Sequence, residues 1–106
     1  MLVLFPHSNL QTAKTRPALV VQADNLQTGL PQVVVAMISS QMFRVGHPCR
    51  VTVPLGSPAG QQSGLLSDSV VMTDNLATAL DKVIDRVVGT LPMNDVDTAL
   101  RHTLGL

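Results

Sequence analysis

The chain has 106 residues, enough for one compact domain spanning residues 1–106 and too few for two. With 45% hydrophobic and 13% charged residues, it is too apolar to be disordered. Seven basic residues balance seven acidic ones, which argues against strong non-specific binding of duplex nucleic acid. The single cysteine and the absence of a signal-peptide pattern or a long apolar run lead us to expect a cytoplasmic protein with no membrane span.

The first third of the sequence predicts three strands. Leu2–Phe5 is a short apolar segment, and Pro17–Gln22 is a second. Between them, the polar residues His7–Thr15 are expected to form a loop, long enough to be a functional flap. Gln32–Ile38 contains three consecutive valines. Because β-branched residues at this density favour a central strand, we expect this segment to be buried on both faces.

The middle of the chain predicts two more strands around a loop. Val51–Leu55 alternates and contains a proline, which is typical of an edge strand. Gly56–Gly64 is rich in glycine, serine and glutamine and is expected to be a flexible loop. Leu65–Asp74 returns to strand character. Five or more short strands with regular turn signals predict a small antiparallel barrel.

The last third of the sequence changes to a helical period. The apolar residues of Leu80–Val88 fall on one helical face, although the end of this segment also fits a strand. A clearer amphipathic stripe follows, for which Asn94 with Asp97 predicts the N-terminal cap and Gly105 predicts the end. We therefore expect a C-terminal helix packed on the barrel.

Candidate functional groups lie where loops meet the predicted strands. Arg16 follows Lys14 and precedes Pro17, so its guanidinium is held by the start of a strand. Ser39 and Ser40 end the buried third strand. A solvated strand cap for Arg16 and local caps for the two serines are the structural alternatives, and the residues alone do not choose between these and a binding site.

Several chemistries lack the residues they need. The three histidines and the single cysteine show no metal-ligand spacing, so we expect no metal and no cofactor. No phosphate-binding glycine loop with its lysine is present, and two phenylalanines are too few for a stacking platform. An arginine with nearby hydroxyls suits a phosphodiester, because the guanidinium holds phosphate oxygens and RNA supplies its own 2′-hydroxyl nucleophile.

The order of the motifs resembles the MazF/PemK toxin family over nearly the whole chain. The motifs that carry the resemblance are Arg16–Val21, Val35–Ser40, Gly64 with Leu65, Asp68–Val71, Asp74, Asp81 with Lys82, Gly89–Leu91 and Leu100–Leu106. The resemblance implies a mostly β (α+β) fold, an SH3-like antiparallel barrel of the MazF, Kid and CcdB type with a C-terminal helix. It also implies a homodimeric toxin of a type II toxin–antitoxin system, which cleaves single-stranded RNA at specific sequences without a metal and is neutralised by a cognate antitoxin.

Site residues follow from the resemblance by position. Arg16 matches the arginine that stabilises the scissile phosphate, and Ser39 matches the catalytic threonine. Four further residues are candidates for catalysis or RNA binding: Ser40, Asp74, His7 and Lys14. Met72 stands where some relatives carry a catalytic arginine, and the family pattern makes only the first part of Leu80–Val88 helical. The alternative hypothesis is a catalytically degenerate or gyrase-directed binding module on the same fold, also neutralised by an antitoxin.

Overall fold

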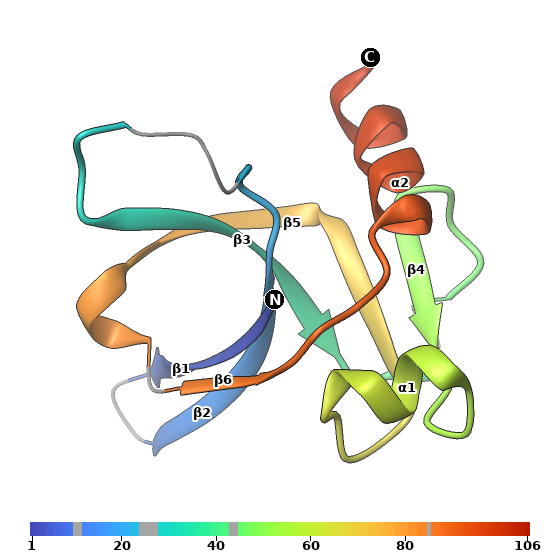
Figure 1. Ribbon diagram of the computed structural model, residues 1–106, viewed down its shortest axis with the longest axis horizontal. Helices are drawn as coiled ribbons and strands as arrows, with labels where there is room; N and C mark the ends of the chain where they lie inside the picture. The colour runs from blue at the N-terminus through green and yellow to red at the C-terminus, as the bar shows by residue number, and fades with distance from the viewer. Residues whose placement is uncertain (10–11, 24–27, 43–44, 85) are drawn as a thin grey trace.

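The computed structural model describes residues 1–9, 12–23, 28–42, 45–84 and 86–106, with residues 5–9, 12–15 and 83 described by their backbone only. This part of the chain forms one antiparallel sheet in the order β4-β5-β3-β2-β1-β6, with two α-helices and a 3-10 turn (Figure 1). The strands are β1 (Leu2–Asn9), β2 (Thr12–Val20), β3 (Gln32–Ser39), β4 (Arg50–Val53), β5 (Ser69–Leu80) and β6 (Arg86–Gly89). The helical elements are α1 (Pro58–Ser63), the 3-10 turn η2 (Asp81–Val83) and α2 (Asn94–Leu104).

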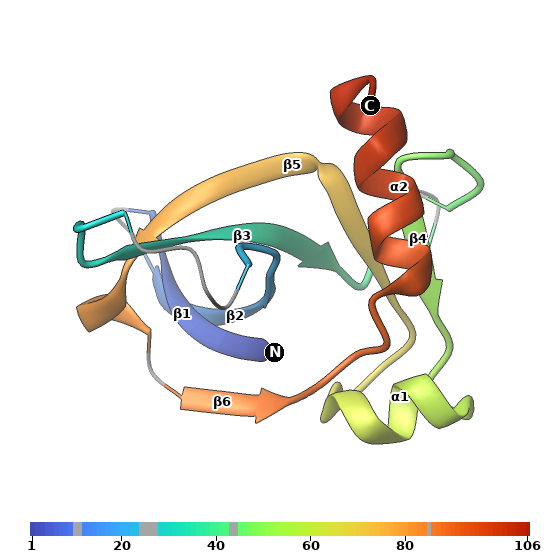
Figure 2. The same cartoon turned by 45° about the horizontal axis from the view of Figure 1, so that its top comes forward.

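The sheet curls until β3 and β5 face β1, β2 and β6, as the two views of the ribbon agree (Figures 1 and 2). The predicted α+β fold with a C-terminal helix is confirmed. Within the described residues the sheet is not closed, however, because the edge strands β4 and β6 do not pair with each other. The barrel expected from the sequence is therefore an open one.

The hydrophobic core lies on the concave face of the sheet and extends to helix α2. Leu2, Leu19 and Ala36 are paired across β1, β2 and β3 and are fully buried. Neighbouring residues such as Val35, which point to the opposite face, are buried as well. The two-sided burial predicted for the third strand is thus confirmed in its middle. Val96 of α2 completes the same core cluster from the helix side.

The hairpin of β1 and β2 replaces the loop expected at residues 7–15. The two strands pair continuously along their length, from Leu2 with Leu19 to Asn9 with Thr12. The prediction was wrong because the ladder is made by backbone groups, which pair regardless of whether the side chains are apolar. The strand pairing instead fixes Arg16 directly opposite Phe5.

Helix α1 replaces most of the flexible loop predicted at residues 56–64. The Ser57 hydroxyl accepts a hydrogen bond from the Gly60 amide at 3.0 Å and so caps the first turn. Gly64 ends the helix with a φ of 75°, a left-handed conformation that glycine adopts without strain. The helix has only six residues and no apolar stripe, so no periodic signal marked it in the sequence.

The gap between the two sheet edges is spanned by α1, which is seated directly on the end of β6. The Thr90 amide donates to the Gln62 carbonyl at 3.1 Å. A Cβ added at Gly89 would lie 2.2 Å from the Ser63 carbonyl oxygen. Only glycine permits this approach of two backbones, and the contact fixes α1 relative to β6.

Strand β5 is longer than predicted and contains a bulge. It begins at Ser69 and runs to Leu80, so the helical period of Leu80–Val88 applies only to its first part, as the family pattern implied: η2 is followed by the strand β6. The pairing with β3 shifts between Ala36 and Met37, which leaves the three residues 73–75 without partners on β3. Such an insertion re-aims the side chains next to it.

The C-terminal helix is present as predicted, with one difference at its start. Met93 occupies the N-cap position and makes no side-chain capping bond, so the cap expected at Asn94 is wrong by one residue. Gly105 ends the helix in the left-handed conformation, as expected. No helix in the described ranges is long and apolar enough to cross a membrane.

Candidate functional site

Arg16, in the middle of β2, and Ser39, the last residue of β3, meet just beyond the end of the ladder that joins these two strands. The last pair in the β2–β3 ladder is Ala18 with Met37, and continuing this register by two residues places Arg16 opposite Ser39. Both residues line a hollow of about 280 Å³, together with Ser40. The structure therefore brings together the arginine and the two hydroxyls that the sequence indicated separately.

A larger cleft of about 500 Å³ adjoins this hollow, and Arg16, Ile38 and Ser40 line both. Part of its lining is a row of side chains from successive strands: Arg86 of β6, Leu4 of β1, Pro17 of β2 and Ile38 of β3. The segment that follows α1, residues 64–67, lines it as well. The cleft is thus built from elements at both ends of the sequence.

The larger cleft is cationic although the whole chain is neutral. Arg16 and Arg86 line it, and no acidic residue of the described ranges does. Both side chains are exposed, and neither forms an ion pair with another described residue. The remaining lining is apolar or carries serine hydroxyls. Guanidinium groups among hydroxyl donors favour an anionic ligand with several oxygens, such as a phosphate.

The Ser39 hydroxyl already makes one local bond. It accepts a hydrogen bond from the Gln41 amide at 3.1 Å, which is the strand-end cap that the sequence suggested as an alternative. This bond uses only an oxygen lone pair, and the hydroxyl hydrogen has no acceptor among the described residues. Ser39 can therefore cap the strand and donate to a ligand oxygen at the same time.

Asp74 lies in the β5 bulge and is directed to β4. Its Oδ2 accepts a hydrogen bond from Arg50 Nη2 at 3.0 Å, and this bond holds the pKa of the Asp74 carboxyl below its usual value of 3.8. Asp74 lines neither the hollow nor the cleft, whereas its neighbour Asn75 lines the hollow. The structure thus keeps Asp74 ionised and paired, and its role in catalysis stays a prediction.

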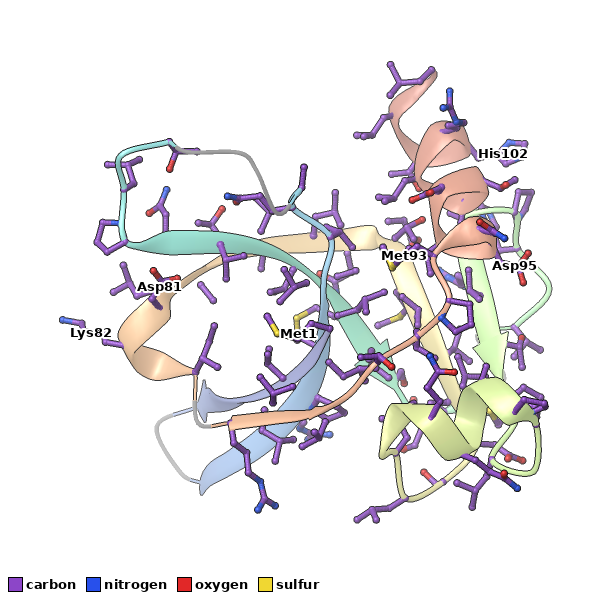
Figure 3. The ribbon with its side chains drawn as sticks, in the orientation of Figure 1. Met1, Asp81, Lys82, Met93, Asp95 and His102 are labelled. Atoms are coloured by element: carbon purple, nitrogen blue, oxygen red, sulfur yellow. The ribbon has the colours of Figure 1, made fainter. Side chains whose placement is uncertain are left out.

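The side chains of His7 and Lys14 lie outside the described part of the structure. The backbone register pairs the two residues with each other, two positions beyond the pair of Phe5 and Arg16. His102 projects from α2 away from the sheet (Figure 3). Among the described residues, no group of three histidine, cysteine or acidic side chains is arranged to hold a metal ion.

Arg86 is a candidate that the sequence did not indicate. It lies within the segment Leu80–Val88, which has helical spacing, and nothing near it in sequence suggests a binding site. Its place in the cleft comes from the pairing of β6 with β1, which joins opposite ends of the chain. Asp81 and Lys82, which contributed to the family resemblance, lie at the end of the sheet away from α2 (Figure 3).

The curled sheet and its cationic, hydroxyl-lined cleft define a small β protein suited to a phosphate-bearing ligand. The chain belongs to the family of PemK-like, MazF-like toxins of type II toxin–antitoxin systems, whose family model matches residues 1–104. The resemblance seen in the motifs is confirmed by this match.

Relatives and solved structures agree over nearly the full length. The chain is 31% identical over 107 residues to Endoribonuclease MazF6 of Mycobacterium tuberculosis, a comparison that covers 97% of this chain and 90% of the relative. The structure resembles that of Mycobacterium tuberculosis toxin MazF-mt6, with a TM-score of 0.72, 24% identity, and 98% and 97% of the two chains covered. It also resembles an endoribonuclease in complex with its cognate antitoxin from a mycobacterial species, with a TM-score of 0.71, 22% identity, and 98% and 92% covered. These two structural likenesses show the fold.

Proposed function

We propose that this protein is the toxin of a type II toxin–antitoxin system and acts in the cytoplasm as a metal-independent endoribonuclease on specific sequences of single-stranded RNA. The observation that carries the proposal is the meeting of Arg16 with Ser39 in one hollow. Family membership and the endoribonuclease named among its relatives supply the reaction class.

The proposed chemistry uses the RNA's own nucleophile. The 2′-oxygen attacks the adjacent phosphorus and loses its proton, while the bond from phosphorus to the 5′-oxygen breaks and that oxygen gains a proton. The products are a 2′,3′-cyclic phosphate and a 5′-hydroxyl end. Arg16 binds the non-bridging oxygens, where negative charge increases in the transition state, and Ser39 donates a further hydrogen bond. Neither role requires a metal ion.

Three of the four other candidate residues receive binding roles in this proposal. Ser40 lines both the hollow and the larger cleft and is placed to contact the RNA backbone beside Arg16. His7 and Lys14 lie opposite each other in the β1–β2 hairpin, beyond Arg16, and are proposed as RNA contacts there. Asp74 is assigned no proton transfer, because its carboxylate is paired with Arg50 and its pKa is lowered.

We also propose that the toxin is a homodimer and that a cognate antitoxin neutralises it. A structurally similar mycobacterial endoribonuclease is known in complex with its own antitoxin. A cationic cleft offers such a partner an anionic binding site, because acidic side chains can occupy the positions of phosphate groups.

The test is cleavage of a long, mixed-sequence single-stranded RNA by the purified protein in excess EDTA. Wild type is compared with Arg16→Ala, Ser39→Ala and Arg101→Ala. Arg101 is an exposed arginine on α2 that lines neither the hollow nor the cleft. We expect discrete fragments from wild type and Arg101→Ala. Arg16→Ala and Ser39→Ala should each cleave at least about 100-fold more slowly.

Three results would contradict the proposed function or its mechanism. Fragments from Arg16→Ala at the wild-type rate, or cleavage that stops in EDTA, would overturn the mechanism. RNA left intact by a folded wild-type protein would favour a binding module on the same fold. Circular dichroism and size-exclusion chromatography on the same preparations establish folding and test the proposed dimer.

A further inference from the structure

We propose that Arg86 binds an RNA phosphate next to the scissile one, so that the cleft holds the RNA strand at two successive points. This inference rests on the proposed function and adds a positioning residue to it. The resemblance assigns no role to Arg86, and its place follows from the pairing of β6 with β1.

The strand register places Arg86 on the cleft side of the sheet. Leu4 of β1 pairs with Pro17 on one side and with Arg86 on the other. Residues that are directly opposite across a ladder point to the same face, so all three side chains share the face that lines the cleft. Two strand spacings separate the backbones of Arg86 and Pro17, which is about 9–10 Å.

The two arginines occupy different parts of the site. Arg16 lines both the small hollow and the larger cleft, whereas Arg86 lines only the larger cleft. A phosphate held by Arg16 with Ser39 therefore lies at the small hollow, away from the β6 side. An RNA strand that runs from this point along the cleft brings a neighbouring phosphate to Arg86.

The environment of Arg86 favours a ligand over a structural role. Its side chain is exposed, and it makes no ion pair or hydrogen bond with another described residue. The backbone that carries it is firmly placed, because β6 pairs with β1 and its end is seated on α1. An exposed arginine on a paired strand, in a cleft that no described acidic residue lines, is suited to binding an anion.

The first test measures binding to a mixed-sequence, single-stranded 2′-O-methyl RNA, which lacks the nucleophile and cannot be cleaved. Fluorescence anisotropy gives Kd at several salt concentrations for wild type, Arg86→Ala, Arg86→Lys and Arg101→Ala. We expect Arg86→Ala to bind about tenfold more weakly. The slope of log K against log salt should fall by about 0.7, the loss of one phosphate contact to a single strand. Arg86→Lys should keep the slope, and Arg101→Ala should match wild type.

The second test locates the phosphate. Single methylphosphonates, which are uncharged, are placed in turn along a non-cleavable RNA containing the sequence that wild type cleaves. One substitution should weaken binding to wild type yet have no effect on Arg86→Ala. We expect it next to the scissile position. If it is the scissile phosphate itself, or if no position behaves in this way, the proposal is wrong.

The outcomes separate this inference from the proposed function. Cleavage by wild type with equal Kd values and salt slopes for Arg86→Ala and Arg101→Ala would overturn the role of Arg86 and leave the ribonuclease intact. Binding that depends on Arg86 in a protein that does not cleave would overturn the ribonuclease and retain the phosphate contact. Equal unfolding midpoints for the two alanine variants confirm that folding is unaffected.

Discussion

The hydroxyl oxygens of Thr73 and Thr103 lie 2.8 Å apart and join the β5 bulge to helix α2. The Thr73 hydroxyl also donates to the Cys49 carbonyl at 2.6 Å, and its side chain is fully buried. Because a hydroxyl carries a single hydrogen, Thr103 is the donor in the bond between the two threonines. The bulge beside the candidate site is thus held by bonds from two directions.

Replacing Thr73 by valine tests this anchor. Thr73→Val keeps the shape of the side chain but leaves the Thr103 hydroxyl without its acceptor and removes one bond to Cys49. We expect the free energy of unfolding to fall by about 1–3 kcal/mol. Thr52→Val, at an exposed position of β4, is the matched control and should change it by less than about 0.5 kcal/mol. Urea denaturation measures the free energy of unfolding of both variants. Equal losses in Thr73→Val and Thr52→Val would contradict the anchoring role of Thr73.

The ion pair of Asp74 with Arg50 predicts a pH dependence of stability. The pKa of Asp74 is lower in the folded protein than in the unfolded chain, so its contribution is complete above the unfolded value of about 4. It is lost as the pH falls through the lower, folded pKa. The pair is partly exposed, with side chains 26% and 34% accessible, so the contribution is below about 1 kcal/mol and weakens with salt.

Asp74→Asn should therefore be less stable than wild type at pH 7 and equally stable near pH 2. Unfolding free energies across this range measure the difference, with the exposed Asp81→Asn as the control. A difference that stays constant down to pH 2 would contradict the effect of the ion pair. The same variant should also retain RNA cleavage within about tenfold, since the proposal gives Asp74 no proton transfer.

The contact between α1 and β6 makes Gly89 sensitive to any side chain. A Cβ in Gly89→Ala would meet the Ser63 carbonyl oxygen at 2.2 Å, and a backbone atom can only move away by displacing α1. We expect a loss of more than about 2 kcal/mol in unfolding free energy. Gly56→Ala is the control, because its Cβ would meet nothing within 4 Å. Thermal unfolding followed by circular dichroism compares them, and similar midpoints would show that α1 is loosely held.

We expect the rate of RNA cleavage to depend on the hydroxyl of Ser39 and not on the small size of its side chain. Ser39→Thr retains the oxygen that accepts from the Gln41 amide and that donates to the substrate, so it should cleave RNA within about threefold of wild type. Ser39→Ala should be slower by about 100-fold. Single-turnover rates on one RNA provide the comparison. Similar losses in both variants would indicate that packing at this position limits the reaction.

The elements predicted best from the sequence were those with a strong local pattern. The middle of β3, at Val35 and Ala36, is buried as the valine-rich pattern indicated, and α2 ends at Gly105 as its apolar stripe indicated. Helix α1 and the outer part of the β1–β2 hairpin, at residues 7–15, were missed because backbone hydrogen bonds and caps hold them, and neither leaves an apolar period.

The residues of the candidate site also divide into those marked by a local sequence pattern and those placed by strand pairing. Arg16 and Ser39 were found because Arg16 directly precedes one apolar strand pattern and Ser39 ends another, and the family motifs connect them. Arg86 was not found, because its position depends on a pairing between the first and last strands. No window of the sequence contains that information. The ion pair that holds Asp74 likewise joins β4 to a bulge whose position only the β3–β5 register reveals.

The pairing of β1 with β6 also affects when the site can form during synthesis. Arg16 leaves the ribosome long before Arg86, by roughly 4–14 s at translation rates of about 5–20 residues per second. Until β6 emerges, one edge of β1 is unpaired and the cationic cleft lacks one side. A nascent chain therefore carries Arg16 and Ser39 without a complete cleft. Products that terminate before β6 have the same deficiency, so the protein acquires its full site only when translation is nearly finished.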